Sequence, residues 1–355
     1  MKEQPLHLIV THAGSFHADE VMAVALLERF YLLRPTQMSV EETEIHASWI
    51  EGQSPPRSGG FFYPDGVEEA RTPVVIIRSR DQKLLEQAKA APHVFTIDVG
   101  GVYAPSLLNF DHHQESMKHT WPDGVPYSST GLIWTWLKER GHLNVLPRMV
   151  QDNLESKLIK MLDAHDNGVE KFPLSSFIAG FNRKSSDAQQ QGQQFLKAKE
   201  VLGEAFDNLR YTLELQFEAE KVVKDAWRKA QQKNELFLQL PRDVDYRDCE
   251  GLAREISKNQ AKMVILPGQG NRFTIKSIPH EHSFKAKCPC PENWRGKMHF
   301  KLFEGQNPVS VHFAHKSGFM CVIEGSRQDA ARVAQYIIDH NQLQLEKKKR
   351  PSYRP

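Results

Sequence analysis

The sequence has little cysteine and no long apolar run. Its four cysteines lie in the last third of the 355 residues without a repeated spacing, so a disulfide framework is not expected. Cys288 and Cys290 are one residue apart, and no familiar zinc spacing completes them. No stretch approaches the ~20 apolar residues of a membrane-spanning helix, and no arginine-rich presequence is visible. We therefore expect a cytoplasmic protein without a membrane partner.

The chain also lacks a strong charge of one sign. Its 46 basic and 44 acidic residues give a net charge of +2, which does not identify a nucleic-acid binder, because a sum can hide a local basic face. Hydrophobic residues make up 40% and charged residues 25%, as in globular proteins. Since 355 residues exceed one ordinary core of about 100–200 residues, we expect two domains.

Short apolar runs alternate with helical patterns through the first half of the chain. The segments are Leu6–Val10, Ala18–Leu33, Pro73–Arg78, Gln82–Ala90 and Val94–Asp98. Such β/α alternation is typical of parallel strands connected by helices that pack on both faces of the sheet. The sequence therefore predicts an α/β fold with a doubly wound, mainly parallel sheet over residues 1–185.

The second half has a different pattern. Residues 186–234 are polar and helix-favouring with regularly spaced apolar positions, which predicts a helical connector. Residues 235–345 hold several short strand patterns and a closing helix over 327–341, which predicts a smaller α+β domain. We expect the last segment, 346–355, to be a mobile basic tail, because it combines a run of lysines with prolines.

Potential metal ligands occur in four short elements of the first half, three of which follow predicted strands. Because ligands gather outside the carboxyl ends of strands in open α/β sheets, these elements can converge on one site. The fourth element lies on the helix predicted over 151–166. The candidates are His12, His17, Asp19, Asp98, Asp111, His112, His113, Asp163 and Asp166.

Each candidate alone also has an ordinary structural interpretation. A histidine near a helix start is often a surface residue, and Asp19 can simply favour the helix dipole. Asp98 can be a turn residue, and Asn167 with Gly168 can cap a helix. The occurrence of all four elements in order after strands is harder to explain this way, and it favours a metal site.

The mixture of imidazoles and carboxylates suits Mn, Zn, Fe or Co better than Ca, which prefers oxygen ligands alone. A bridging carboxylate such as Asp98 could hold two metals ~4 Å apart, the arrangement that activates water for attack at phosphorus. The residues therefore point to phosphoryl hydrolysis.

Short motifs rich in polar residues and glycine occur along most of the chain. In the first half they are Thr11-His12-x-Gly14-Ser15-Phe16-His17-x-Asp19-Glu20, Asp98-Val99-Gly100-Gly101, Phe110-Asp111-His112-His113-Gln114, Ser129-x-Gly131-Leu132 and Asp163-x-x-Asp166-Asn167-Gly168. In the second half they are Lys276-Ser277-Ile278-Pro279, Pro291-Glu292-x-Trp294-Arg295-Gly296 and Phe313-x-His315-x-Ser317-Gly318-Phe319. In these motifs the sequence resembles the Myg family of the DHH phosphoesterase superfamily, and the resemblance extends over nearly the whole chain.

The resemblance implies a two-metal site with Mn as the first choice and Zn, Fe or Co as alternatives. It implies that His12, His17 and Asp98 hold one ion, and that the other is held by Asp19, Asp98, His112 and Asp163. DHH proteins usually place a carboxylate where His17 stands, which shifts the preference away from Mg.

The resemblance also implies roles beyond the metal ligands. Asp98, Asp111, His112 and His113 would form the catalytic set, with Asp111 orienting an imidazole and His113 meeting a phosphate oxygen or the leaving group. In the second domain, phosphate binding is expected for Arg295, His315, Ser317 and Gly318. The two domains would close over the substrate.

The expected function is a metal-dependent phosphodiesterase. The family resemblance implies an exonuclease that acts from the 3′ end of single-stranded RNA or short oligonucleotides. Two alternatives stay open: a small-molecule phosphohydrolase that acts on pyrophosphate or a dinucleotide, and a non-catalytic regulatory protein that keeps the metal site. No residue pattern indicates an oligomeric state.

Overall fold

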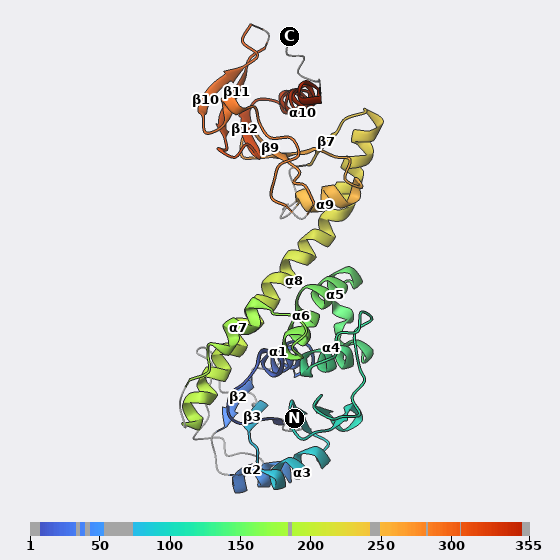
Figure 1. Cartoon of the computed structure of the whole chain (residues 1–355), viewed down its shortest axis with the longest axis vertical. Helices are drawn as coiled ribbons and strands as arrows, with labels where there is room; N and C mark the ends of the chain where they lie inside the picture. The colour runs from blue at the N-terminus through green and yellow to red at the C-terminus, as the bar shows by residue number, and fades with distance from the viewer. Residues whose placement is uncertain are drawn as a thin grey trace, which may run out of the picture. The chain divides into compact units, whose positions relative to one another are not determined.

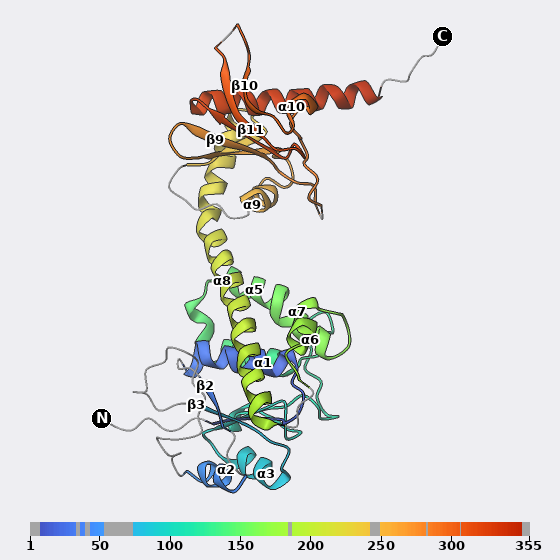
Figure 2. The ribbon, with the colours of Figure 1, turned by 90° about the vertical axis from the view of Figure 1, so that its left-hand side faces the viewer.

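The structure is a computed structural model in two units (Figures 1 and 2). Unit 1 is Met1–Tyr211 and unit 2 is Thr212–Pro355. The residues that the structure describes are 8–32, 36–39, 43–52, 74–183, 187–241, 249–281, 283–305 and 307–349. Each unit has its own sheet and its own hydrophobic core.

Unit 1 is built on a six-stranded sheet. In spatial order the strands are β2 (Thr36–Ser39), β3 (Val74–Arg78), β1 (Leu8–Thr11), β4 (Val94–Ile97), β6 (Asn109–Phe110) and β5 (Tyr103–Ala104). All neighbouring pairs are parallel except β5 with β6. The prediction of a mainly parallel sheet is confirmed.

Helices cover both faces of this sheet, as the doubly wound prediction requires. Leu8 and Val10 of β1 pack in one apolar cluster with residues of α2 (Thr43–Ile50) and α3 (Gln82–Ala90). The helices α1 (Ala18–Leu27) and α4 (Ser129–Glu139) lie on the opposite face (Figure 1). The strands are buried on both faces, which explains their continuous apolar runs.

The strand order reverses beside β1. The chain first builds β2 and β3 on one side of β1, and then places β4 on its other side. In open α/β sheets, this reversal leaves a crevice outside the carboxyl ends of the two adjacent strands. The residues that follow β1 and β4 therefore meet there, and they are His12 and Asp98.

Some elements of unit 1 were not indicated by the sequence. These are β2, α2, the short strands β5 and β6, α4, and α7 (Pro173–Ala179). The helix predicted over 151–166 begins at Arg148 and contains a π-helical turn, Glu155–Ile159, between α5 (Arg148–Leu154) and α6 (Lys160–Asp166). A π-turn shifts the helical register, so residues after it face a direction that a regular period does not predict.

A single helix, α8 (Ala188–Gln232), occupies the segment predicted as a connector. The division between the two units falls within it, after Tyr211. Its first part belongs to unit 1, where Phe195 packs edge-on against Phe16 with ring centroids 5.4 Å apart. The connector therefore also contributes to the core of unit 1.

Unit 2 has a second six-stranded sheet. The order is β10 (Met298–Leu302), β11 (Val309–Ala314), β12 (Met320–Glu324), β9 (Arg272–Ser277), β8 (Met263–Pro267) and β7 (Phe237–Gln239). Only the β7–β8 pair is parallel. One apolar cluster joins this sheet to α10 (Arg327–Lys349), and another joins it to the end of α8 and α9 (Cys249–Ile256). The α+β prediction is confirmed.

The chain end differs from the expected tail. Helix α10 continues to Lys349, so the segment predicted to be mobile from residue 346 is helical at its start. Residues 350–355 lie outside the described part of the chain. Among the helices that the structure describes, none combines the length and apolar character needed to cross a membrane.

The packing of α4 against α6 depends on Gly131. A Cβ built on Gly131 would lie 2.1 Å from Oδ2 of the buried Asp163 side chain. We predict that Gly131→Ala lowers the free energy of unfolding by about 3 kcal/mol, because overpacking at a buried site forces neighbours apart. Thermal and denaturant unfolding followed by circular dichroism measure this change.

The matched control is Gly180→Ala at the end of α7. The backbone φ there is −65°, and the new Cβ would meet one atom within 4 Å, the Phe177 carbonyl oxygen at 3.1 Å. We expect a change within about 1 kcal/mol. Equal effects of the two substitutions would contradict the tight contact at Gly131.

Candidate metal centre

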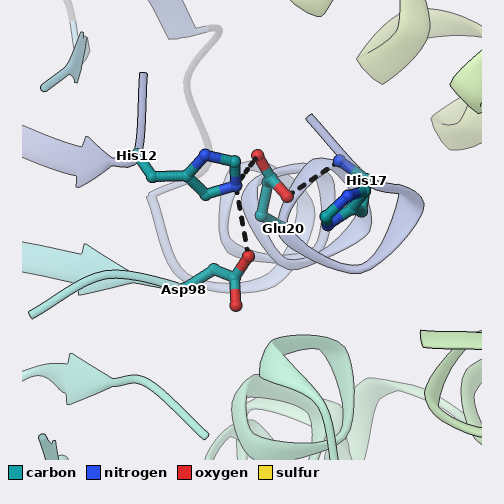
Figure 3. A group of neighbouring side chains, drawn as sticks. All are labelled: His12, His17, Glu20 and Asp98. Atoms are coloured by element: carbon teal, nitrogen blue, oxygen red, sulfur yellow. Dashed lines mark hydrogen bonds and ion pairs between the residues drawn. The ribbon is translucent and has the colours of Figure 1, made fainter. Parts of the chain in front are cut away.

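His12 is the first residue after β1, and it points into the crevice beside β4. Its Nε2 lies 2.9 Å from Glu20 Oε1 and 3.4 Å from Asp98 Oδ2 (Figure 3). On the other side of the ring, Nδ1 lies 3.2 Å from the Ala13 carbonyl oxygen. Arg80 Nη2 also lies 3.2 Å from Nδ1, so Nδ1 is engaged away from the cluster and Nε2 is the nitrogen that faces the carboxylates.

The first turn of α1 carries two carboxylates that are almost completely buried. Asp19 is 1% and Glu20 is 0% exposed. The His17 backbone N–H donates to Glu20 Oε2 at 2.9 Å, so this oxygen caps the helix while Oε1 faces His12 (Figure 3). Negative charge at a helix N-terminus is favoured by the helix dipole, which makes this position suitable for two acids.

Asp98 follows β4 in a left-handed backbone conformation, with φ of 56°. Non-glycine residues adopt this conformation at a cost, and such strain concentrates at functional sites. Its two carboxylate oxygens face different partners: Oδ2 faces His12, whereas Oδ1 lies 3.2 Å from His112 Nε2 and 3.5 Å from His113 Nδ1. Asp98 therefore stands between two sets of imidazoles.

Asp166 completes the far side of the cluster. Its Oδ2 lies 3.3 Å from His112 Nε2, and its Oδ1 lies 3.9 Å from His17 Nδ1. The side chain of His17 is 61% exposed and that of His112 only 9%. The cluster is thus closed on the protein side and open to solvent beside His17.

Asp111 holds the exposed ring of His113. Its Oδ1 lies 2.8 Å from His113 Nδ1 and accepts the His113 backbone N–H at 3.0 Å, while its Oδ2 accepts the Gly101 backbone N–H at 2.6 Å. Gly101 has φ of 66°, so a glycine suits this turn. The hydrogen bond that His113 Nδ1–H donates to Asp111 raises the pKa of His113 to about 9.

The cluster concentrates negative charge in a buried place. Burial raises the pKa of Asp19, Glu20 and Asp166, and their acidic neighbours add to the shift. Burial alone would lower the pKa of His12, but contacts with Asp98 and Glu20 raise it to about 10. At Asp98 burial acts in the other direction and would raise the pKa, but contacts with His112 and His12 lower it well below its usual value. A cation placed here would relieve repulsion among the carboxylates.

The donor set fits divalent metal ions. Three groups of side chains place ligand atoms within 4.8 Å of one another: His12 with His17, Glu20 and Asp98; Asp98 with His112 and His113; and His17 with Asp19 and Asp166. Asp19 Oδ1 is buried and has no hydrogen-bond partner among the described residues, whereas the equally buried Glu20 Oε1 faces His12 and His112 Nε2 faces Asp98 and Asp166. Buried polar atoms without partners are costly, and a metal ion would satisfy them.

In unit 2 the structure brings together the four residues predicted to bind phosphate. Arg295 Nε donates to the Cys290 carbonyl oxygen at 2.8 Å, and the Gly318 carbonyl accepts from Cys290 N at 2.8 Å. His315 Nδ1 accepts from the Ser317 N–H at 3.2 Å and lies 2.8 Å from the Ser317 hydroxyl. In a neutral ring, Nε2 of His315 therefore carries the proton and can donate it to an anion.

Comparison with known proteins identifies the family. A family model described as an uncharacterised protein family (UPF0160) matches residues 8–338. The chain belongs to this family.

Individual relatives agree with the match. The MYG1 protein of Dictyostelium discoideum is 29% identical over 341 residues, covering 88% of this chain and 91% of the relative. The MYG1 exonuclease of Homo sapiens is 25% identical over 349 residues, covering 88% and 81%. The solved structure of RecJ from Thermus thermophilus in complex with Mn²⁺ aligns with 11% identity and a TM-score of 0.26, covering 95% of this chain and 52% of RecJ.

In this member of UPF0160, Asp163 lies apart from the other predicted ligands. Asp163 is fully buried, and its carboxylate accepts hydrogen bonds from Trp121 Nε1 at 2.7 Å, Ser128 Oγ at 2.6 Å and Gly131 N at 3.0 Å. It is absent from the three ligand groups, where Asp166 from the same helix is present. A spacing of three residues makes the two acids neighbours on α6, so their different surroundings come from the elements that pack around each of them.

Several residues at this centre were not assigned a role from the sequence. Glu20 is adjacent to Asp19 in the first turn of α1, and only the close approach of His12 shows that it belongs to the cluster. Arg80 Nε and Arg78 Nη2 donate to the carbonyl oxygens of Ala13 and Gly14, at 2.8 Å and 2.9 Å. Arg78 is the last residue of β3 and Arg80 follows it, and β3 is the neighbour of β1 in the sheet. Their position at a strand end was the sequence signal that could have placed them near the site.

A pair of isosteric substitutions distinguishes the roles of the two aspartates on α6. We predict that Asp166→Asn weakens Mn²⁺ binding about tenfold or more, because it removes a candidate ligand charge. We predict that Asp163→Asn mainly lowers the melting temperature, because it disturbs a buried acceptor of three hydrogen bonds. Calorimetric Mn²⁺ titration and thermal unfolding measure both effects. Weaker Mn²⁺ binding in Asp163→Asn with unchanged binding in Asp166→Asn would show that Asp163 is the ligand.

Proposed function

We propose that this chain is a metal-dependent phosphodiester hydrolase that uses two metal ions bridged by Asp98. The supporting observation is that Oδ1 and Oδ2 of this one carboxylate face different imidazoles, His112 and His12. A shared carboxylate between two sets of ligands is what a two-metal phosphoesterase requires.

His12, His17 and Asp98, together with Glu20, would hold one ion. The second would be held by Asp98, His112, Asp19 and Asp166, which takes the place expected for Asp163. Mn²⁺ is our first choice, with Zn, Fe or Co as alternatives, because the ligands mix imidazole and carboxylate. When bound, such ions activate water and neutralise charge that develops on the phosphoryl group.

The protein's own groups would orient the substrate and supply a proton donor. The ring of His113 is 62% exposed at the edge of the cluster, and Asp111 holds its Nδ1, so that Nε2 is the nitrogen left for substrate. When Nε2 is protonated, it is suited to donate to a phosphate oxygen or to the leaving oxygen. Asp111 acts through His113 by fixing the orientation of the ring.

The substrate that we propose is single-stranded RNA or a short oligonucleotide, cleaved from the 3′ end. The family match and the relatives named MYG1 exonuclease support a nucleic-acid substrate. In unit 2, Arg295 uses Nε within the protein, and its two Nη groups form no hydrogen bond to the described residues. They are available for a phosphate, together with Nε2 of His315.

The direct test is cleavage of a labelled single-stranded RNA by purified protein with Mn²⁺. We predict shortening from the 3′ end, loss of cleavage in EDTA, and a fall of about a hundredfold or more in kcat/KM for Asp98→Ala and His112→Ala. Equal cleavage by both variants and the natural protein would overturn the catalytic assignment. A matched control is His142→Ala, a half-buried histidine outside the three ligand groups.

A panel of substrates identifies the finer class. RNA and DNA strands of equal length, dinucleotides and pyrophosphate are compared at several salt concentrations, and RNA with a blocked 3′ end tests direction. We expect cleavage of RNA to fall with salt, since contacts to several phosphates release counterions. Cleavage of pyrophosphate or dinucleotides alone would replace the exonuclease proposal with a small-molecule phosphohydrolase.

A further inference from the structure

Ser129 is the first residue of α4, and it contacts two acids that come from different elements. Its backbone N–H donates to Asp19 Oδ2 at 3.3 Å, and its hydroxyl lies 3.3 Å from Asp98 Oδ1 as donor. The residue is 0% exposed. The hydroxyl is also 3.2 Å from the Phe110 carbonyl, and with one proton it donates to one of these oxygens at a time.

These contacts leave the remaining oxygens of both acids facing the cluster. At Asp19 the bond uses Oδ2, while Oδ1 is buried and makes no hydrogen bond within the described chain. At Asp98 the bond approaches Oδ1 on the side of His112, and Oδ2 remains toward His12. One donor residue therefore orients both carboxylates and leaves a free oxygen at Asp19.

The position of Ser129 is itself fixed by Asp163. The preceding Ser128 hydroxyl and the Gly131 N–H both donate to Asp163 Oδ1, at 2.6 Å and 3.0 Å. Thr130 Oγ1 donates to the Asp19 carbonyl at 2.8 Å, which ties the start of α4 to the start of α1. The buried carboxyl group of Asp163 thus accepts hydrogen bonds at the N-terminus of α4 and holds the helix end where Ser129 reaches both acids.

We propose that Ser129 is a positioning residue of the metal centre: its hydroxyl and backbone N–H set the orientation of Asp98 and Asp19 as ligands. This inference rests on the proposed metal-dependent function. Groups that hydrogen-bond to metal ligands typically change metal affinity by about 10–100-fold when they are removed, because a freely rotating ligand must be ordered on binding.

The test compares two adjacent buried serines in the full-length protein. Ser129→Ala removes the hydroxyl near Asp98, whereas Ser128→Ala removes the hydroxyl that binds Asp163. Both are measured by Mn²⁺ titration calorimetry well below the melting temperature of the metal-free protein. We expect Ser129→Ala to weaken Mn²⁺ binding about tenfold or more, and Ser128→Ala to change it less than about threefold while lowering the melting temperature.

A second variant keeps the test decisive if Ser129→Ala does not fold. Ser129→Cys nearly preserves the side-chain volume and offers a weaker donor, so we expect an affinity between those of the natural protein and the alanine variant. If the natural protein binds Mn²⁺ and a folded Ser129 variant binds it with the same affinity, this inference alone is overturned. Failure of the natural protein to bind any of Mn²⁺, Zn²⁺, Fe²⁺ and Co²⁺ would overturn the proposed function as well.

Discussion

The buried carboxylate of Asp98 is the group on which the arrangement of unit 1 depends. It is 4% exposed and stands at the end of β4 with a strained backbone, between His12 on one side and His112 on the other. The strand order around β1 brings these three residues together, although 100 positions separate His12 from His112. The sheet thus converts an ordered series of short motifs into one concave site.

Keeping four acids in this place is costly, and the surrounding structure compensates for the cost. Asp19 and Glu20 lie at the N-terminus of α1, where the helix dipole and backbone N–H groups favour negative charge. Asp98 is stabilised by its imidazole neighbours, and Ser129 donates from the start of α4. Asp19 Oδ1, which is buried and has no hydrogen-bond partner among the described residues, shows where this compensation is incomplete. A divalent cation would supply the missing partner.

The sequence predicted the class of fold and most of the cluster, because both follow from local patterns. Apolar runs identified β1, β3 and β4, and ligand-type side chains at their ends pointed to a shared crevice. That Asp166, and not Asp163, lies among the candidate ligands was not predictable in this way. Both acids stand on one helix three residues apart, and a π-turn precedes them, so their directions depend on packing against α4.

Other features were hidden for similar reasons. Glu20 reads as an ordinary acidic residue in the first turn of a helix, and only the approach of His12 from another element distinguishes it. Ser129 reads as a helix start, and its contacts with Asp19 and Asp98 join residues 110 and 31 positions away. In unit 2, the motif residues Arg295 and Gly318 meet through the backbone of Cys290, a contact that no spacing reveals.

The central claim is that Asp98 bridges two metal ions. Anomalous diffraction from crystals of the full-length protein grown with Mn²⁺ tests it most directly. We predict two anomalous peaks, one on each side of the Asp98 carboxylate and ~4 Å apart, the first near His12 and the second near His112. Manganese bound elsewhere with no peak beside Asp98, or a single peak that one oxygen of Asp98 alone contacts, would contradict the bridge.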